Sequence, residues 1–208
     1  MKRLVLAVLS VFMLISCSVK KNVLIIGDSI SIGYTPFVKE ALAKKANVVH
    51  NYGNARFTGI GIDSLDSWLG NTDWDVIHFN FGLHDLCYRT TPTNRDKVNG
   101  KLTTTLEDYE SNLRKIVERL KKTDAKLIFA TTTVVPEKEP GRFAEDVDKY
   151  NAVAVKVMKE NSIQINDLHE YSKEIHAKFG NGETDVHYQK EGYRRLSKPV
   201  VKVIKKKF

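Results

Sequence analysis

Two residues suited to acyl transfer, Ser29 and His187, stand far apart in the chain. Ser29 ends the triplet Gly27-Asp28-Ser29, which directly follows the apolar, β-branched run Val23–Ile26. Such a run predicts a strand buried on both faces. A serine after such a strand lies at the carboxyl edge of a parallel sheet, near a helix N-terminus whose N–H groups can stabilise an oxyanion. The triplet alone is a weak signal, because Asp and Ser are common turn and N-cap residues.

Further polar groups follow the other predicted strands or lie late in the chain. Because the carboxyl ends of parallel strands meet at one rim of a sheet, we expect these groups to line one crevice with Ser29. Together they supply a base, oxyanion donors and substrate contacts, which are what acyl transfer to a serine requires. The groups are Gly53, Arg56, His84, Thr132, Asp185 and His187. Of these, Arg56 and Thr132 are predicted to bind substrate, although a surface salt bridge is the alternative for Arg56.

Apolar runs alternate with longer amphipathic segments, which predicts βαβ units around a parallel sheet. The expected strands are 23–26, 48–50, 76–80, 127–131 and 163–166. The expected helices are 35–45, 106–122, 145–160, 168–178 and 190–205, with Pro199 kinking or dividing the last one. We therefore predict one α/β domain over residues 23–208, a flavodoxin-like three-layer α/β/α sandwich with a five-stranded parallel sheet. Residues 88–105 lack periodicity and are predicted to form a surface excursion near the active face.

Residues 1–16 have the pattern of a lipoprotein signal peptide. Lys2-Arg3 precedes the apolar stretch Leu4–Ile15, which is shorter than the roughly 20 residues that span a bilayer. Leu14-Ile15-Ser16-Cys17 resembles the bacterial lipobox, whose cysteine is lipidated and becomes the new N-terminus. We expect an exported protein anchored by Cys17 in the bacterial cell envelope, with 17–22 as a tether. The alternative is a plain secretory signal in which Cys17 is incidental.

Composition narrows the possible partners. The chain has 33 Lys and Arg against 25 Asp and Glu, a net charge of +8. Lysines at 202 and 205–207 contribute to this excess, and we interpret them as a solvated helix end rather than a nucleic-acid site. With Cys17 lipidated, Cys87 is left as an unpaired, buried thiol. No HExxH motif, paired cysteines or phosphate-binding glycine loop occurs, so we predict no metal and no cofactor.

Four blocks of residues resemble those of the SGNH hydrolases, also called GDSL-type esterases and lipases. Gly27-Asp28-Ser29-Ile30 resembles the nucleophile block, and Gly53 the glycine of the second block. Gly82-Leu83-His84-Asp85 stands where the family has Gly-x-Asn-Asp. Asp185-Val186-His187 resembles the block that supplies the base. The resemblance covers nearly all of the chain after the leader, in the family's order.

The resemblance implies that Ser29 is the nucleophile and His187 the general base. It also implies that the backbone N–H groups of Ser29 and Gly53 are oxyanion donors. The family's third oxyanion donor is an asparagine, and here His84 takes its place. An imidazole can donate through a ring N–H, so we expect His84 to keep that role. The alternative is that His84 only packs in its loop.

The acid of the expected triad is displaced by one residue. The family usually has Asp three residues before the histidine, a position held here by Thr184, whereas Asp185 lies two residues before His187. Either Asp185 orients His187, or a backbone carbonyl does so in a Ser-His dyad. We predict Asp185. Catalysis need not depend wholly on this acid, because nucleophile, base and oxyanion hole each contribute.

The resemblance implies a serine esterase that hydrolyses carboxylic esters through an acyl-enzyme. Exported, lipid-anchored proteins of this kind resemble enzymes that deacetylate carbohydrate, so a small-molecule or glycan ester is the expected substrate. A lysophospholipase or thioesterase is the alternative within the same chemistry. From other classes, a non-catalytic glycan-binding SGNH-like module and, more remotely, a nucleotide-binding flavodoxin-like domain are the rivals.

Overall fold

Five parallel strands form the centre of the molecule, as the sequence predicts. The computed structural model describes residues 19–208. The strands are β1 (Lys21–Ile26), β2 (Ala46–His50), β3 (Val76–Phe79), β6 (Lys126–Ala130) and β7 (Gln164–Asn166), in the order β2-β1-β3-β6-β7. Every neighbouring pair is parallel. The chain moves outward from β1 to β2 and then returns to place β3 on the other side of β1. The carboxyl ends of β1 and β3 therefore flank the position where open α/β sheets bind their ligands.

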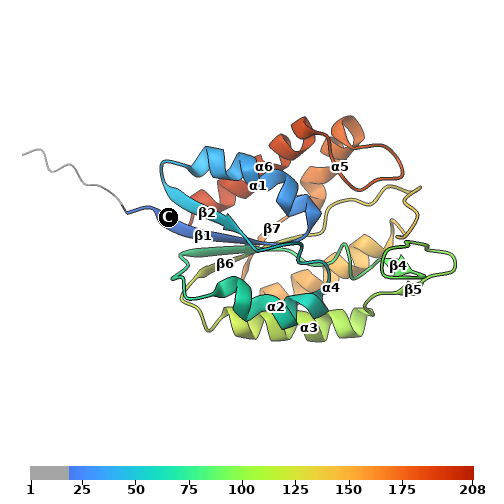
Figure 1. Ribbon diagram of the computed structural model, residues 1–208, viewed down its shortest axis with the longest axis horizontal. Helices are drawn as coiled ribbons and strands as arrows, with labels where there is room; N and C mark the ends of the chain where they lie inside the picture. The colour runs from blue at the N-terminus through green and yellow to red at the C-terminus, as the bar shows by residue number, and fades with distance from the viewer. Residues whose placement is uncertain (1–18) are drawn as a thin grey trace, which may run out of the picture.

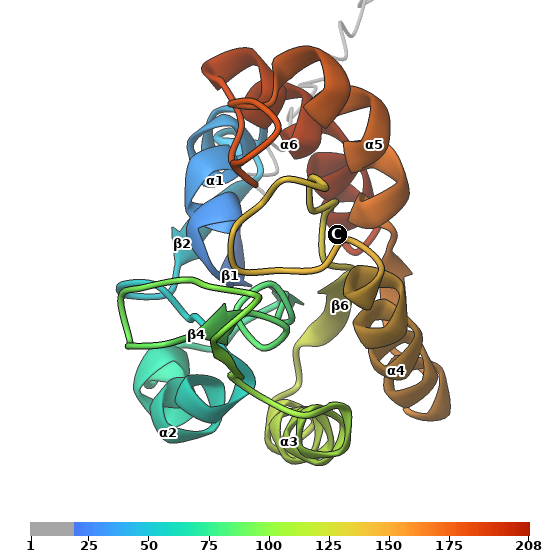
Figure 2. The same ribbon diagram turned by 90° about the vertical axis from the view of Figure 1, so that its right-hand side faces the viewer.

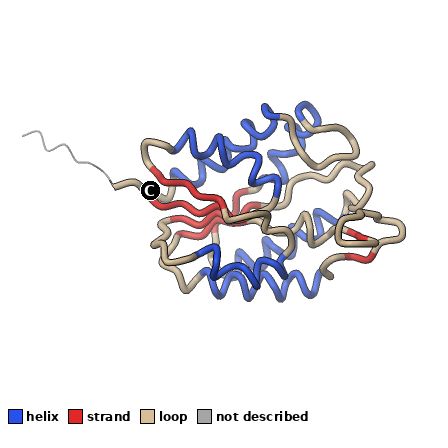
Figure 3. Tube along the Cα trace, viewed as in Figure 1, coloured by secondary structure: helices blue, strands red, loops and turns tan. Residues whose placement is uncertain are grey.

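Helices cover both faces of the sheet (Figures 1 and 3). One layer contains α1 (Ser29–Leu42), α5 (Leu168–Phe179) and α6 (Lys190–Lys205). The other contains α2 (Thr58–Leu69), α3 (Leu106–Leu120) and α4 (Asp146–Glu160). The core strands carry fully buried apolar side chains, such as Val23 and Ile77. This confirms the predicted three-layer α/β sandwich, which leaves loops at the sheet edges as the place for a site.

The first helix begins at Ser29, not at residue 35 as predicted. Asp28 is its N-cap, and the Asp28 side chain accepts a hydrogen bond from the N–H of Ile30. The prediction was wrong because Gly33 and Pro36 are poor helix formers. Gly33 is required by packing, since a Cβ there would lie 2.2 Å from the ring of Tyr193 on α6. Close contact between α1 and α6 thus outweighs local propensity.

The second helix, α2, was missed in the sequence. Two glycines obscure its pattern, although buried residues recur at helical spacing at Thr58, Gly61, Leu65 and Leu69. A Cβ at Gly61 would lie 2.7 Å from the ring of Phe81, so the glycine makes room for an aromatic side chain of the core. Here too the helix is stabilised by tertiary packing rather than by intrinsic preference.

The remaining elements follow the predictions within two residues at each end. Strand β1 starts at Lys21, so Lys21 and Asn22 pair with β2 instead of belonging to the predicted tether. Helix α6 is unbroken across Pro199, so the predicted division of that helix is wrong. Cys87 is a buried free thiol.

The predicted excursion contains a small antiparallel pair, β4 (Tyr88–Arg89) with β5 (Lys101–Leu102). Figure 2, which looks onto this end of the molecule, shows the excursion in front of the central sheet. It is fixed by backbone hydrogen bonds from Tyr88 to Gly141 and from Lys97 to Pro140. The excursion is therefore held against the loop that precedes α4, beside the carboxyl edge of the sheet.

Two findings concern residues 19–208 only. None of the helices there has the length and apolar character that a membrane span requires. The same part of the chain has no cluster of three or more His, Cys, Asp or Glu side chains arranged to hold a metal ion. The predicted signal peptide and Cys17 lie outside the described residues.

Candidate active site

The structure brings Ser29 and His187 together, although 158 positions separate them in the chain. Ser29 Oγ lies 2.8 Å from His187 Nε2. Ser29 is the first residue of α1, directly after β1, while His187 lies in the loop that leads into α6. Packing of α1 against α6 thus carries the two ends of the chain to one edge of the sheet. A hydroxyl and an imidazole at this distance have the geometry of a nucleophile and its general base.

Asp185 reaches the imidazole despite its displaced position. Its Oδ1 lies 2.5 Å from His187 Nδ1 and also accepts a hydrogen bond of 3.0 Å from the backbone N–H of His187. An aspartate that caps the N–H two residues later forms a local turn, and this turn directs the carboxylate toward the ring. Thr184, which holds the family's usual position, is exposed. The loop therefore adapts to the shift of one residue.

The carboxylate of Asp185 fixes the tautomer of His187. An ionised carboxylate only accepts hydrogen bonds, so Nδ1 carries the proton and Nε2 presents its lone pair to Ser29. Burial by itself favours the protonated acid, but the backbone and ring hydrogen bonds of His187 hold the pKa of Asp185 below its usual value. Asp185 is consequently ionised at neutral pH, as an orienting acid must be.

Gly53 follows β2 in a loop that is tied to the nucleophile loop. The Asn51 side chain accepts a hydrogen bond from the N–H of Gly27 and donates to the carbonyls of Tyr52 and Gly53. Gly53 has a φ of +72°, a conformation that glycine adopts without strain. Within the described residues its N–H makes no hydrogen bond. The N–H of Ser29 is at the start of α1, where helix donors lack an intrahelical partner.

His84 lies in the turn after β3, beside the nucleophile. Gly82, at the start of this turn, has a φ of +143°, and a Cβ there would lie 2.2 Å from Thr132 Oγ1. Asp85, at its end, accepts hydrogen bonds from the N–H and hydroxyl of Thr58. The turn is therefore fixed from both sides, and its imidazole lines the same cavity as Ser29.

The neighbours of His84 determine its charge and tautomer. Burial, together with the positive charges of Arg142, Arg89 and Arg56, lowers the pKa of His84 to about 3, so the ring is neutral. The guanidinium of Arg89 lies 3.3 Å from His84 Nδ1 and can only donate, so Nδ1 accepts and Nε2 carries the proton. His84 Nε2–H makes no hydrogen bond to the described residues. A neutral imidazole with a free N–H can serve as the donor that the family's asparagine supplies.

Two adjoining hollows open at this edge of the sheet. The first, about 240 Å³, is lined by Ser29, Asn54, Leu83, His84, Arg89, Thr93, Arg95, Arg142, Val186 and His187. The second, about 430 Å³, is lined by Asn54, Arg56, Phe57, His84, Arg89, Pro92 and Thr103. Asn54, His84 and Arg89 line both, so the two hollows adjoin, and we refer to them together as the cleft. Arg56 thus lies in the cleft, and it makes no ion pair with the described residues.

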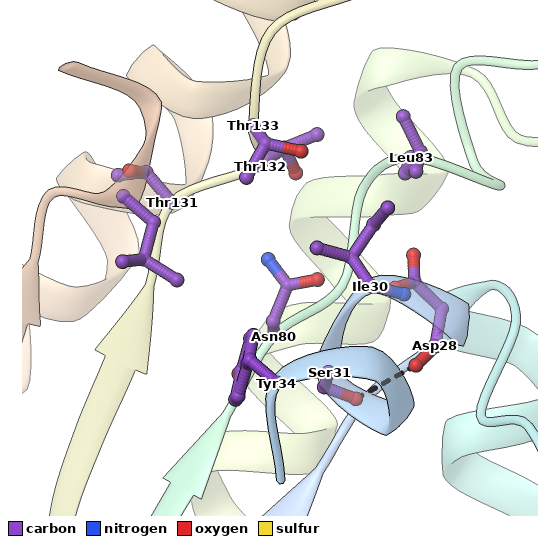
Figure 4. A pocket seen from close by; sticks show the side chains of 10 residues that line it. Asp28, Ile30, Ser31, Tyr34, Asn80, Leu83, Thr131, Thr132 and Thr133 are labelled. Carbon is purple, nitrogen blue, oxygen red and sulfur yellow. Dashed lines mark hydrogen bonds between the residues drawn. The ribbon is translucent and has the colours of Figure 1, made fainter. Parts of the chain in front are cut away.

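Thr132 lies elsewhere, which corrects its predicted place in the crevice. It is buried, its N–H donates to Asn151, and its hydroxyl donates to the carbonyl of Phe81. Thr132 and its neighbours line a small pocket of about 10 Å³ together with Asp28. Figure 4 shows the side chains around it. The residue therefore supports the framework behind the nucleophile and has no surface in the cleft. The strand order places Thr132 at the carboxyl edge of the sheet, as predicted. Because Thr132 is buried, however, a substrate in the cleft cannot contact it.

Three site features were missed or undervalued in the sequence. Arg89 and Arg95 come from the excursion, whose lack of periodicity gave no signal of their direction. Arg142 is buried, donates to the carbonyl of Leu83 and pairs with Glu139, so it supports the loop of His84 as well as lining the cleft. Asn51, which joins the two loops, carried one usable signal: it is a polar residue directly after a strand.

Comparison with known proteins identifies the class of this chain. Residues 25–195 match the GDSL-like Lipase/Acylhydrolase family. The chain belongs to this family and is an esterase. No curated protein is similar enough in sequence to count as a match.

Solved structures share the fold at low sequence identity. A lipase/acylhydrolase from Enterococcus faecalis is 19% identical with a TM-score of 0.71, covering 89% of this chain and 96% of its own. Axe2, an acetylxylan esterase from Geobacillus stearothermophilus, is 17% identical with a TM-score of 0.72, covering 88% and 94%. The acetyl xylan esterase AlAXEase is also 17% identical with a TM-score of 0.72, covering 88% and 99%. These likenesses support the SGNH hydrolase fold.

Proposed function

We propose that this protein hydrolyses carboxylic esters through an acyl-enzyme on Ser29. The observation that carries the proposal is the chain of contacts from Ser29 Oγ to His187 and from His187 to Asp185, at 2.8 and 2.5 Å. Such a chain activates a serine hydroxyl, which is a weak nucleophile by itself.

The geometry supports the following steps. His187 Nε2 takes the proton from Ser29 Oγ as the oxygen attacks the ester carbonyl. The oxyanion then lies against the N–H groups of Ser29 and Gly53 and against Nε2–H of His84. The bond to the alcohol oxygen breaks, and His187 gives its proton to that oxygen. Water attacks the acyl-enzyme with His187 again as base, which releases the acid and restores Ser29.

The direct test compares Ser29→Ala with the wild-type protein on p-nitrophenyl acetate. We expect kcat to fall by several orders of magnitude, as on removal of a triad nucleophile. A fluorophosphonate probe should label the wild-type protein and fail to label this variant. Undiminished turnover or labelling in Ser29→Ala would refute the proposed nucleophile.

For the substrate, we propose a short acyl group, such as acetyl, on a carbohydrate. The hollow at Ser29 is lined by three arginines, while Leu83 and Val186 are its aliphatic residues, so a long acyl chain would have to lie against charged groups. Two solved structures of the same fold are described as acetylxylan esterases, which is consistent with a carbohydrate ester.

A second candidate, a long-chain acyl hydrolase of the lysophospholipase or thioesterase type, has one observation in its favour. A mainly apolar hollow of about 360 Å³ is lined by Ile32, Thr35, Pro36, Lys39, His50, Asn51 and Gly53. A p-nitrophenyl ester series from acetate to palmitate separates the two. We expect kcat/KM to fall beyond butyrate, whereas a maximum at octanoate or longer would favour the second candidate.

We also propose that the protein is exported and anchored in the bacterial envelope through a lipid on Cys17. The lipobox-like Leu14-Ile15-Ser16-Cys17 supports this, and Lys21 at the start of β1 leaves a tether of a few residues. Expression with radiolabelled palmitate should label the wild-type chain in the membrane fraction. Cys17→Ser should be unlabelled, and labelling that persists in it would exclude this anchor.

A further inference from the structure

The cleft beside Ser29 has an excess of positive charge that hydrolysis of a neutral ester does not require. Four arginines line it: Arg56 from the loop after β2, Arg89 and Arg95 from the excursion, and Arg142 from the loop before α4. Neither hollow has an Asp or Glu among its lining residues. Guanidinium groups keep their charge at all physiological pH values, so this charge is permanent.

Part of the charge is neutralised by a single buried acid. Glu139 is fully buried, and its Oε1 lies 2.8 Å from Arg95 and 2.7 Å from Arg142. One carboxylate therefore serves two guanidinium groups. Its other oxygen accepts the N–H of Gly141, so it stabilises the loop that holds Arg142.

The other two arginines have no acidic partner within the described residues. Arg89 donates to the carbonyl of Pro92 and to His84 Nδ1, which are both neutral groups. Arg56 is exposed, has a φ of +51° and makes no side-chain hydrogen bond to the described residues. Both line the larger hollow with Phe57, and Arg89 also lines the hollow at Ser29. Gathering cations in this way costs electrostatic energy, which a bound anion would offset.

We propose that Arg56 and Arg89 bind an acidic group on the alcohol part of the ester, so that the preferred substrate is an O-acylated acidic sugar. This inference rests on the proposed function and specifies its substrate class. The planar forks of arginine match the oxygens of a carboxylate, and a sulfate on the sugar would offer similar oxygens. The larger hollow, at about 430 Å³, has room for a sugar ring beside these cations, and Phe57 offers an apolar surface to its C–H groups.

The test uses two sugars that differ in one charge. Methyl 2,3-di-O-acetyl-glucopyranosiduronic acid carries a carboxylate, and its 6-methyl ester has the same acetyl groups without the charge. Acetate release is measured for both. We expect kcat/KM for the acid to exceed that for the methyl ester by about tenfold or more at ~0.01 M salt. This ratio should fall as salt is raised to ~1 M, because exposed charges are then screened. A 6-O-sulfated acetylated methyl glucoside shows whether sulfate replaces the carboxylate.

Two variants separate local recognition from overall charge. Arg56→Gln should reduce the acid-to-ester ratio several-fold. Arg114→Gln removes the same charge from α3, where Arg114 pairs with Glu110 and Glu160, and should leave the ratio unchanged. Equal slowing of both esters in Arg56→Gln would overturn the proposal, because it would mean that Arg56 serves the oxyanion alone. A wild-type ratio of one or less would also overturn it.

The outcome for the substrate class is distinguishable from the outcome for the proposed function. Hydrolysis of both sugars and of p-nitrophenyl acetate without preference would leave the esterase standing and reject the acidic substrate. If no ester is hydrolysed, the proposed function fails, and calorimetric binding of the two sugars to Ser29→Ala still decides the charge preference. Tighter binding of the acid would support the anionic subsite, and equal binding would reject it.

Discussion

Two serines of helix α1 each form a hydrogen bond with a histidine, but the two pairs differ in their surroundings. In the first, Ser29 Oγ lies 2.8 Å from His187, and Asp185 stands behind the ring. In the second, Ser31 Oγ lies 2.6 Å from Nε2 of His50, and the backbone carbonyl of Asn51 stands behind the ring at 2.8 Å. The second pair is local, with 19 positions between its members, whereas the first joins the two ends of the domain.

The two pairs differ in their access to solvent and in the groups that surround them. Ser29 opens into the cleft, whose lining includes the neutral ring of His84. Ser31 is 2% exposed, and its hydroxyl also lies 2.7 Å from the carbonyl of Asp28. Ser31 is too buried for an ester carbonyl to approach it, and none of the carboxylates in residues 19–208 makes an ion pair or hydrogen bond with His50. The comparison teaches that a hydrogen-bonded Ser-His pair is insufficient for catalysis, which also needs access, an acid and oxyanion donors.

Replacing Asp185 should leave the Ser29–His187 pair without a carboxylate behind the ring, as in the Ser31–His50 pair. In Asp185→Asn the amide can donate to His187 Nδ1, which favours the unproductive tautomer, and the imidazolium loses its counter-charge. We expect kcat on p-nitrophenyl acetate to fall about a thousandfold. Stopped-flow measurement of acyl-enzyme formation checks whether the loss is in the acylation step. A loss below tenfold would mean that a backbone group orients His187.

Removing the side-chain oxyanion donor should have a smaller effect. His84→Ala should lower kcat on the order of 100-fold, because one preformed donor to the oxyanion is lost. His84→Asn restores an N–H donor and should stay within about tenfold of wild type. Equal, severe losses in both variants would show that His84 does more than donate a hydrogen bond.

The second pair should matter for stability rather than rate. Ser31→Ala removes a buried hydroxyl and leaves the Asp28 carbonyl and His50 without it, so we expect a loss of about 1–2 kcal/mol in the free energy of unfolding. Turnover should remain within a few-fold of wild type, and the fluorophosphonate probe should still label Ser29. Urea denaturation and the esterase assay measure the two effects. A collapse of activity in the folded variant would give the second pair a catalytic role.

The carboxylate of Asp185 should make the stability of the protein depend on pH. Because the folded-state pKa of Asp185 is lowered, its ionised form contributes stability that is fully present above the unfolded value near 4 and is lost as pH falls through the folded value. Since the Asp185 side chain is 38% exposed, the contribution should be less than about 1 kcal/mol. Denaturation of wild type and Asp185→Asn at pH 3 and pH 7 should show a gap at pH 7 that shrinks at pH 3. A constant gap would mean that the carboxylate charge contributes nothing.

The pairing of Asp185 with His187 shows where sequence reasoning reached its limit. The spacing left two ways to orient the imidazole, because a shift of one residue normally redirects a side chain. The turn in which Asp185 accepts the N–H of His187 resolves the choice, and this turn depends on loop geometry. The same limit applies to Thr132, since its strand position was evident but its burial depended on the packing of Asn151 and Phe81.

The helices also differ in how well the sequence predicts them. The α6 pattern has a strong apolar stripe, and its ends match the prediction at Lys190 and Lys205. The first turns of α1 and the whole of α2 contain glycines that lower helix propensity, so local signals pointed away from helix. Those glycines exist to admit the rings of Tyr193 and Phe81, which are distant in the chain. Propensity is local, but the contacts that override it are not.

By itself, the sequence determined the parallel α/β class, the family, and the serine and histidine proposed as nucleophile and base. These follow from short-range patterns: apolar runs, a Gly-Asp-Ser triplet and a histidine block, each readable within a few residues. The tertiary structure alone decided which of two serine–histidine pairs faces solvent, how Asp185 reaches its ring, and that arginines from three segments gather around one cleft. Such features depend on the direction and burial of side chains, which are set only when distant segments pack together.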